Sequence, residues 1–225
     1  MRISVIIPVL NEEKTIRAAV GAVTSLRPHE VIVVDGGSTD RTREICAELG
    51  ATLLASRPGR ALQMNQGARR ASGDVLLFLH ADTRLPLSAF DDIRAALKNP
   101  RSVGGRFDVK LDNDRWLFRI VGVMISLRSR LSRVATGDQG IFVRREVFER
   151  IGGYPEVPFM EDIAFSRALK RTGRVACLRS RVITSARRWE MEGVGRTIMK
   201  MWTLKSLYLL GVSPLRLKRF YGDGR

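Results

Sequence analysis

The sequence has few of the residues that build disulfide frameworks or zinc sites. Its 225 residues include two cysteines, Cys46 and Cys177, and two histidines. Two cysteines this far apart form no disulfide framework, and with so few histidines they do not match a zinc-binding pattern. We therefore expect a protein of a reducing compartment without structural zinc.

Long apolar runs, signal sequences and repeats are also missing. No stretch of about 18 uncharged apolar residues is present that could span a bilayer. The first residues read as a strand and lack the length and cleavage region of a signal peptide. We find no internal repeat and no low-complexity segment. The expected location is cytoplasmic, either free or peripheral at the inner face of the membrane.

Acidic residues are in deficit. Lys and Arg number 39 and Asp and Glu 23, so the formal net charge is +16. This surplus predicts an anionic partner, which could be nucleic acid, an anionic membrane surface or a phosphorylated substrate. We expect no nucleic acid, because the aromatic and basic residues do not form a recognised binding module.

Short apolar runs alternate with segments of helical periodicity in the first hundred residues. Pro8 is expected to end the first strand, and Asn11 is expected to cap the helix that follows. Such alternation predicts an α/β fold with a mostly parallel, Rossmann-like sheet and helices on both faces. The predicted strands are 3–7, 31–34, 51–55 and 75–79, and the predicted helices are 15–26, 41–49, 60–71 and 88–97.

The second half of the chain has a different pattern. Residues 104–111 alternate as a strand exposed on one face, and 141–143 are strand-like. Helices are predicted at 116–131, 145–151, 161–171 and 194–210.

Polar residues follow the predicted strands at their carboxyl ends, the edge where open α/β sheets bind ligands. A carboxylate such as Asp82 could hold a divalent cation and, through it, a diphosphate, or it could cap a turn before Pro86. The glycine motifs of dinucleotide folds and of P-loops are both absent. A phosphate-bearing ligand would therefore be held by a metal and by arginines. The polar residues at these strand ends are Asn11, Glu12, Asp35, Asp40, His80 and Asp82.

Four segments, in order, resemble the motifs of family 2 glycosyltransferases, which have the GT-A fold. They are Ser4 to Glu13, Val31 to Asp40, Leu77 to Asp82, and Gly152-Gly153-Tyr154 followed by Glu161-Asp162. The resemblance covers about residues 1 to 190. It implies a nucleotide-sugar-binding half at 1–100 and an acceptor-binding half at 101–190 of the same domain. The residue pattern adds a basic amphipathic helical segment at 191–225.

The resemblance also implies roles for individual residues. Asp82 matches the last carboxylate of the D-x-D motif, which binds Mn2+ or Mg2+, and His80 stands at the first acid and could be a second ligand. Asp162 matches the general base, although by itself it could be a helix N-terminal acid paired with the macrodipole. The implied donor-binding residues are Pro8, Asn11, Glu12, Asp35, Arg60, Asn65, Ala81 and Asp82. Residues implied or open for acceptor or diphosphate contact are Asp138, Gln139, Glu161, Arg187, Arg188 and Trp189.

Some of these residues keep a structural alternative. Asp138 could cap a turn, and Arg187 and Arg188 could form a basic surface turn. Ser185 stands where processive synthases carry the glutamine of Q-x-x-R-W, and those enzymes also have membrane helices. We therefore expect transfer of one sugar and no polymerisation.

The expected activity is metal-assisted, inverting transfer of a sugar from a nucleotide-sugar donor, expected to be UDP-linked, to an acceptor hydroxyl. His80-Ala81-Asp82-Thr83 and Gly137 to Gly140 further resemble a compact bacterial subgroup named for arsenosugar biosynthesis or radical-SAM association. Two alternatives stay open: a nucleotidyltransferase that makes a nucleotide sugar, and a catalytically inactive nucleotide-sugar-binding protein. The first usually has a glycine-rich, arginine-containing loop after strand one, which is absent here.

The segment 116–133 and the C-terminal helix are each apolar on one side and basic on the other. Such helices could lie on an anionic membrane, which would suit a lipid-linked acceptor. Alternatively, their apolar faces could pack on the core or across a dimer.

Overall fold

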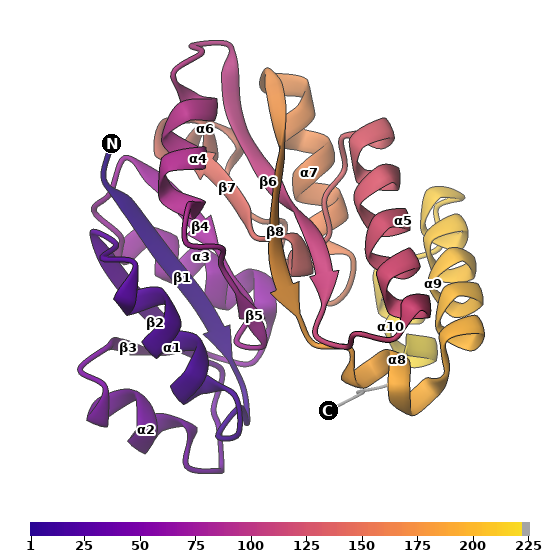
Figure 1. Cartoon of the computed structure of the whole chain (residues 1–225), viewed down its shortest axis with the longest axis horizontal. Coiled ribbons are helices and arrows are strands. Elements are labelled where there is room, and N and C mark those ends of the chain that lie inside the picture. The colour runs from indigo at the N-terminus through magenta and orange to yellow at the C-terminus, as the bar shows by residue number, and fades with distance from the viewer. Residues whose placement is uncertain (222–225) are drawn as a thin grey trace.

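Eight strands within residues 1–221, the part of the chain that the computed structural model describes, form one mixed sheet (Figure 1). Their order is β3-β2-β1-β4-β7-β6-β8-β5. The pairs β3–β2, β2–β1, β1–β4 and β6–β8 are parallel, and the other three are antiparallel. The strands are β1 (Ile3–Val9), β2 (Glu30–Asp35), β3 (Thr52–Ala55), β4 (Val75–Phe78), β5 (Thr83–Arg84), β6 (Ser102–Leu111), β7 (Ile141–Arg144) and β8 (Arg174–Thr184).

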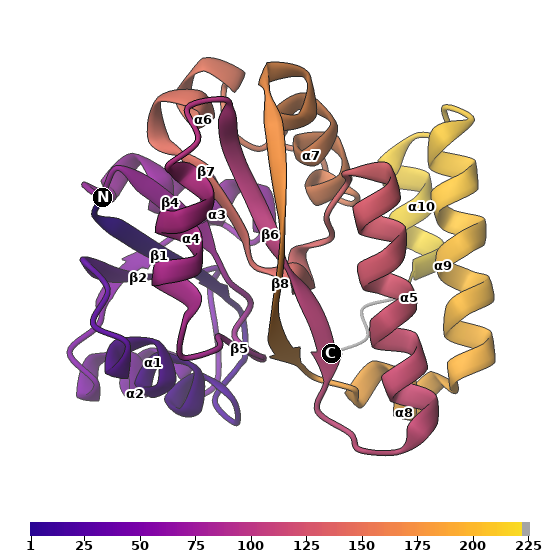
Figure 2. The ribbon, with the colours of Figure 1, turned by 45° about the horizontal axis from the view of Figure 1, so that its top comes forward.

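Helices cover both faces of this sheet (Figures 1 and 2). Alternate residues of β1 point to opposite faces, as the period of a strand requires. Val5 and Ile7 belong to the core cluster that includes α1 and α4, whereas Ile6 belongs to the cluster under α3, α6 and α7. The helices are α1 (Ile16–Ser25), α2 (Thr42–Glu48), α3 (Arg60–Arg70), α4 (Ala89–Leu97), α5 (Trp116–Ser132), α6 (Arg145–Ile151), α7 (Glu161–Thr172), α8 (Arg187–Glu192), α9 (Val194–Leu209) and α10 (Pro214–Tyr221), with a short 3-10 helix η1 (Gly137–Gln139).

The predicted α/β class is confirmed, and the predicted elements of the first hundred residues end within about two residues of the observed ones. The prediction that Pro8 ends the first strand is wrong, because β1 continues to Val9. Ile6 accepts a hydrogen bond from the backbone of Leu79, so Ile6 and Pro8 both face β4. Since β4 ends at Phe78, the missing N–H of Pro8 faces no strand partner and disrupts no ladder bond.

Strand β6 is buried over most of its length, and the expectation of an exposed face is wrong. Neighbouring strands pass close to its two glycines: a Cβ on Gly104 would lie 2.4 Å from the carbonyl oxygen of Phe142, and one on Gly105 would lie 2.5 Å from that of Ala176. Elements β5, β8, α8 and α10 were not expected from the sequence. Within residues 1–221, no helix is both long enough and apolar enough to cross a bilayer.

Candidate functional site

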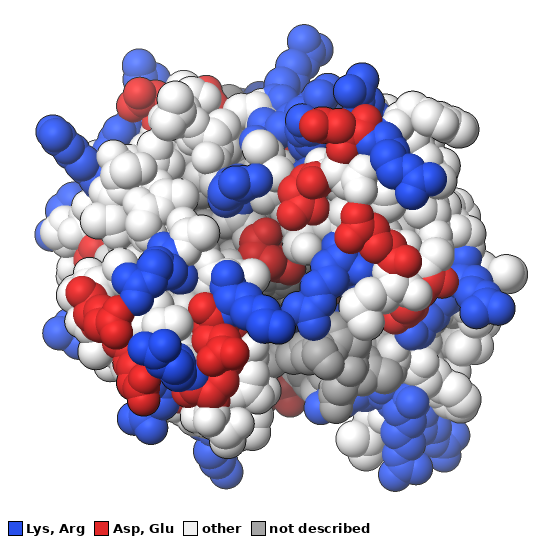
Figure 3. All heavy atoms as spheres, turned by 60° about the horizontal axis from the view of Figure 1, so that its bottom comes forward, with Lys and Arg blue, Asp and Glu red and all other residues white. Residues whose placement is uncertain are grey.

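Three strand ends meet at the lower edge of the sheet in Figure 1. Strand β1 lies between β2 and β4 and runs parallel to both, so the loops that follow the three strands open on the same side. On the face seen in Figure 3, acidic and basic side chains are intermixed, and an acidic side chain lies near the centre between Lys and Arg side chains. The first candidate site is therefore this edge.

Asn11 connects the loops that follow β1 and β2. Its Oδ1 accepts the backbone N–H of Thr39 at 2.9 Å, and its own N–H donates to the Ser38 hydroxyl at 2.9 Å. Its φ of 54° is a left-handed conformation that Asn tolerates better than most residues. The prediction that Asn11 caps the first helix is wrong: α1 begins at Ile16 and has no side-chain cap.

Asp35 is a buried carboxylate at the end of β2. It accepts the backbone N–H of Gly37 at 3.2 Å and that of Ser38 at 3.1 Å, together with the Ser38 hydroxyl. The guanidinium of Arg43 lies 3.8 Å away. Asp35 therefore holds the loop after β2 in a fixed shape beside the half-buried Pro8 of β1.

Asp40 and Glu12 fix the same pair of loops from the other side. The Asp40 carboxylate accepts the N–H of Glu13 at 3.1 Å, and the N–H of Glu12 donates to the Thr42 hydroxyl at 2.8 Å. The Glu12 carboxylate also accepts the hydroxyl of Thr15 at 2.8 Å. The two loops that carry the predicted donor-binding residues are thus held together by direct contacts.

Asp82 lies just beyond β4, after the buried Ala81. Burial raises the pKa of the Asp82 carboxyl, the Glu12 carboxylate raises it further, and Asp138 adds a smaller effect. The nearby Arg60 guanidinium acts in the opposite direction. The Asp82 residue as a whole is exposed to solvent, so these effects act on a carboxyl group that a ligand can reach. Asp82 therefore lies within electrostatic reach of Glu12, Arg60 and Asp138, which come from distant segments of the chain.

Asp162 and its neighbour Glu161 occupy the first turn of α7. Asp162 accepts the backbone N–H of Gly137 at 2.8 Å and that of Ile163 at 2.7 Å. Burial raises the pKa of the Asp162 carboxyl despite these two bonds and the nearby Arg60. Burial and the Asp162 charge raise the pKa of Glu161 to about 7.

A small cavity lies next to this acidic pair. Its walls include His80 and Tyr154 besides the two carboxyl groups. The His80 ring packs directly against the loop before β7, because a Cβ on Gly137 would lie 2.4 Å from its Nε2. His80 is therefore adjacent to the backbone that binds Asp162.

The two predicted acceptor residues of the η1 loop differ in their hydrogen bonding. Gln139 is buried, and its amide accepts the N–H of Thr136 at 3.1 Å and donates to the carbonyl of Phe107 at 3.3 Å. Asp138 Oδ1 is shielded from solvent and has no hydrogen-bond partner among residues 1–221. Gln139 therefore builds the loop, whereas Asp138 has an oxygen available for a ligand.

Asn65 of α3 is buried and makes two bonds of 2.8 Å to the backbone N–H and carbonyl of Tyr154. A Cβ on Gly153 would lie 2.6 Å from the Asn65 side chain, and Gly153 has a φ of 80°. The ring of Tyr154 stacks on Phe165 with centroids 4.2 Å apart. Asn65 therefore fixes the backbone of the Gly-Gly-Tyr segment, and its Nδ2 and Oδ1 are both already hydrogen-bonded.

The C-terminal residues reach the site from α8 and α10. The Arg188 guanidinium lies 4.3 Å from the Tyr221 ring centroid, and its Nη1 is buried without a partner among residues 1–221. Arg187 is exposed, and Trp189 packs against the core cluster under α1 and α4. Of the three predicted residues, Arg188 is the one directed toward the site.

Sequence reasoning missed Tyr221 and Lys218 of α10. Burial raises the pKa of Tyr221, while Arg188 and Arg60 act in the opposite direction, and Lys218 acts to lower the pKa of Glu161. Ser213-Pro214 is a helix-start pattern that could have predicted α10. Nothing local in the sequence indicates that this helix packs beside Phe159, whose ring lies 4.5 Å from Tyr221.

The carboxylate oxygens at this edge fit a divalent cation that a diphosphate would also coordinate. Among residues 1–221, no three His, Cys, Asp or Glu side chains form a preformed metal cage. Mg2+ is usually held by one or two carboxylates plus substrate phosphates, and Mn2+ also prefers oxygen ligands. The exposed carboxylate of Asp82 and the unpartnered Oδ1 of Asp138 provide such oxygens.

Comparison with known proteins gives a consistent result. The family model described as glycosyl transferase family 2 matches residues 4–152. The probable glycosyltransferase YdaM of Bacillus subtilis is 26% identical in an alignment of 217 positions, which covers 85% of this chain and 51% of that protein. The PGL/p-HBAD biosynthesis glycosyltransferase of Mycobacterium bovis is 32% identical in an alignment of 164 positions, which covers 67% of this chain and 62% of that protein.

Solved structures share the fold. The Staphylococcus aureus TarS fragment 1–349 in complex with UDP-GlcNAc superposes with a TM-score of 0.65 at 21% identity, over 82% of this chain and 58% of that one. Glucosyl-3-phosphoglycerate synthase from Mycobacterium tuberculosis, with Mn2+ and UDP-glucose, gives 0.60 at 22% identity, over 80% and 69%. The chain spans about half the length of the first curated relatives.

Proposed function

The chain belongs to glycosyl transferase family 2 and has the GT-A fold, and we propose that it moves one sugar from a nucleotide-sugar donor to an acceptor hydroxyl with inversion and metal assistance. One observation carries this proposal. Asp82 and Asp162, 80 positions apart in the chain, lie near the same guanidinium, that of Arg60, at the ligand-binding edge of the sheet.

The proposed donor site is the pair of loops after β1 and β2. Asp35 and Asn11 are held rigidly there, which suits recognition of a base and ribose beside Pro8 and Glu12. TarS and glucosyl-3-phosphoglycerate synthase were each solved with a UDP-sugar, which supports a UDP-linked donor. Asn65, which the resemblance placed near the nucleotide, is proposed to act by positioning the Tyr154 segment.

Asp82 is the proposed main metal ligand. A bound Mn2+ or Mg2+ would neutralise the diphosphate and stabilise the charge that develops on the leaving oxygen. Arg60, and Arg188 with its unpartnered Nη1, are proposed to add positive charge to the same leaving group. The role of His80 as a second ligand stays a prediction.

Asp162 is the proposed general base. Each of its oxygens accepts one backbone N–H, which orients the carboxylate and leaves lone pairs for an acceptor hydroxyl. Its raised pKa makes it a better proton acceptor than an exposed aspartate. Direct attack by the deprotonated hydroxyl, opposite to the leaving diphosphate, inverts the anomeric carbon.

Asp138, with its unpartnered Oδ1, is proposed to contact the acceptor if it does not bind the metal.

A lipid-linked acceptor with peripheral membrane contact belongs to this proposal, because several apolar side chains of α5 and α9 are exposed. The cytoplasmic location, the division at residues 100 and 190, the transfer of a single sugar and the arsenosugar-type subgroup stay predictions. The family match gives no support to a nucleotidyltransferase, and an inactive sugar-nucleotide binder is an outcome of the tests.

Calorimetry with UDP, with and without Mn2+, tests the donor site. We expect Mn2+-dependent UDP binding by the wild type and a loss of about tenfold or more in Asp82→Ala, because a main cation ligand is removed. Asp91→Ala, which removes an exposed aspartate of α4, is the matched control and should bind like wild type. Equal UDP affinity with and without Mn2+, in both wild type and Asp82→Ala, would remove the metal-site assignment.

A thermal-shift screen of UDP-, GDP- and dTDP-sugars with Mn2+ then selects the donor. Stabilisation by a UDP-sugar above the other two is expected, because a ligand that binds only the folded state raises the melting temperature. Stabilisation by GDP- or dTDP-sugars alone would overturn the uridine preference. Metal-dependent donor binding without any turnover across an acceptor panel would instead favour the inactive binder.

A further inference from the structure

Helix α5 has a long apolar face whose side chains lie outside the protein core. Six of its side chains are between 45% and 78% exposed: Trp116, Ile120, Val123, Met124, Leu127 and Leu131. At about 100° per residue, they fall within an arc of about 100° along the whole helix. Phe118 and Val121 make the core contacts instead, so packing on this core does not explain the six exposed side chains.

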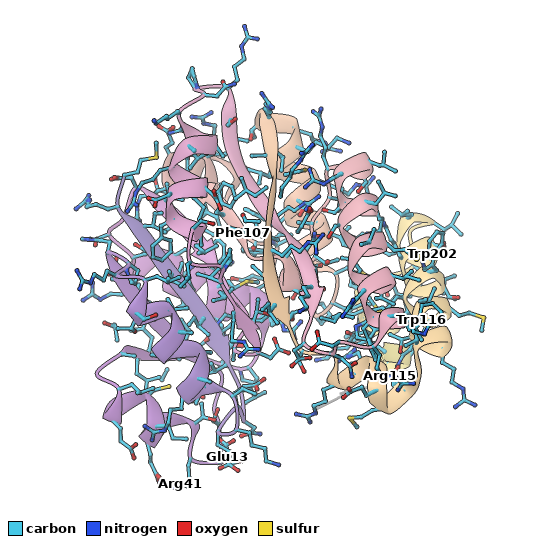
Figure 4. The ribbon with its side chains drawn as sticks, viewed as in Figure 1. Glu13, Arg41, Phe107, Arg115, Trp116 and Trp202 are labelled. Carbon is cyan, nitrogen blue, oxygen red and sulfur yellow. The ribbon has the colours of Figure 1, made fainter. Side chains whose placement is uncertain are left out.

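Helix α9 extends this surface. It lies beside α5 in both ribbon views (Figures 1 and 2), and its Trp202, Met199 and Leu209 are also exposed. Figure 4 shows Trp116 and Trp202 on these two neighbouring helices. The stripe along α5 is itself contiguous, and contiguous apolar surface of this kind is rare on proteins that remain monomeric in water and marks an interaction site.

A basic cleft of about 460 Å³ runs beside the apolar face of α5, between that helix and strands β6 and β8. Arg119 of α5 and Arg181 of β8 line it, and neither has an acceptor for its guanidinium among residues 1–221. The third arginine of the cleft, Arg130, is bound to Asp108 at 2.6 Å. Two uncompensated cations therefore face this cleft.

The cleft and the apolar face are continuous, because Val123 and Leu127 belong to both. On the helical arc, Arg119 and Arg130 fall on the flank of the apolar stripe that adjoins the cleft. Apolar side chains next to cations are the arrangement of helices that lie in the interface of an anionic bilayer. A second copy of the chain is an unfavourable partner for this face. Each copy has a formal charge of +16, so the basic clefts of two copies would repel each other.

We propose that the α5–α9 face is a docking surface for an anionic phospholipid bilayer. Headgroup phosphates bind Arg119 and Arg181, and the apolar stripe of α5, with Trp116 at its N-terminal end, enters the boundary with the acyl chains. This inference deepens the membrane contact of the proposed function. It requires no sugar transfer, because vesicle binding is measured without a donor.

The test is sedimentation with phosphatidylcholine vesicles that contain about one third phosphatidylglycerol, at low salt. Each arginine near an anionic surface contributes about 1 kcal/mol of binding free energy. The variant Arg119→Gln/Arg181→Gln should therefore bind the vesicles about 25-fold more weakly than wild type. Arg69→Gln/Arg70→Gln, which removes two exposed cations of α3, is the control with the same charge and should lose clearly less.

The apolar contribution is tested with Trp116→Ser/Leu131→Ser, which should lose at least about tenfold in partitioning. Leu87→Ser removes a side chain that is 89% exposed elsewhere on the surface, and it should bind like wild type. All variants should melt near the wild-type temperature, because only exposed side chains change.

Three results would overturn the proposal. They are equal binding to pure phosphatidylcholine vesicles, wild-type binding by both Arg119→Gln/Arg181→Gln and Trp116→Ser/Leu131→Ser, and a dimer in light scattering that Trp116→Ser/Leu131→Ser dissociates. The last result would assign the surface to a second copy of the chain. None of these results depends on whether the protein transfers sugar, so this inference and the proposed activity fail separately.

Discussion

Replacement of Glu161 by glutamine should stabilise the protein at neutral and alkaline pH in the absence of metal and nucleotide. Glu161 is buried beside Asp162, and these two causes raise its pKa from 4.5 to about 7. The folded protein therefore binds this proton more tightly than the unfolded chain does. The contribution of the protonated Glu161 to the free energy of unfolding is fully present below pH about 4.5, and it is lost as pH rises through about 7.

The magnitude follows from the size of that shift. A change from 4.5 to about 7 corresponds to about 3 kcal/mol of unfavourable free energy at pH 8, where Glu161 is ionised in both states. At pH 5 the folded protein keeps this proton, and the same relation leaves less than about 1 kcal/mol. For a chain of this size, about 3 kcal/mol corresponds to roughly 6–12 °C in melting temperature.

Urea and thermal unfolding at pH 5 and pH 8, in EDTA, measure this difference. Glu161→Gln should be more stable than wild type by about 3 kcal/mol at pH 8 and by less than about 1 kcal/mol at pH 5. Glu156→Gln changes an exposed glutamate near the same helix and should leave both values unchanged. An equal gain at the two pH values, or a loss of stability at pH 8, would refute the assigned burial and charge repulsion.

Three further substitutions test the site and its support. Asp162→Asn keeps the shape of the side chain but removes the proton acceptor, so UDP release in the presence of acceptor should fall about 10²- to 10⁴-fold with little change in Mn2+-dependent UDP affinity. Turnover like that of wild type would exclude Asp162 as the base. Asn65→Ala leaves two buried backbone groups of Tyr154 without partners and should cost about 2–4 kcal/mol in urea unfolding. Gly137→Ala would place a Cβ 2.4 Å from the His80 ring, so we expect a loss of about 1–3 kcal/mol in thermal unfolding.

Matched controls exist for the last two substitutions. Arg69→Ala changes an exposed residue of the same helix as Asn65 and should stay within about 0.5 kcal/mol of wild type. Gly21→Ala lies inside α1 with nothing within 4 Å of its Cβ position and should stabilise by about 0.5–1 kcal/mol. If Asn65→Ala or Gly137→Ala behaves like its control, the corresponding contact does not support the site.

The first half of the fold could be predicted because its signals are local. Runs such as Val31 to Val34 are β-branched, short and bounded by polar turns, and the helices between them have regular apolar spacing. Strand β8 was missed because Arg179 and Arg181 interrupt its apolar pattern, although its backbone pairs with β6 over most of that strand. The antiparallel insertion of β7 beside β4 depends on pairing between residues about 65 positions apart, such as Phe78 and Ile141, which no local pattern encodes.

The sequence determined which residues stand at the ends of strands and helices, including Asp35, Asp82 and Asp162. Only the tertiary structure decided what each can do. Asn65 and Gln139 are bonded to backbone, Asp138 keeps an unpartnered oxygen, and the apolar face of α5 lies outside the core. The physical reason is that burial, charge repulsion and hydrogen-bond saturation depend on which distant segments come together.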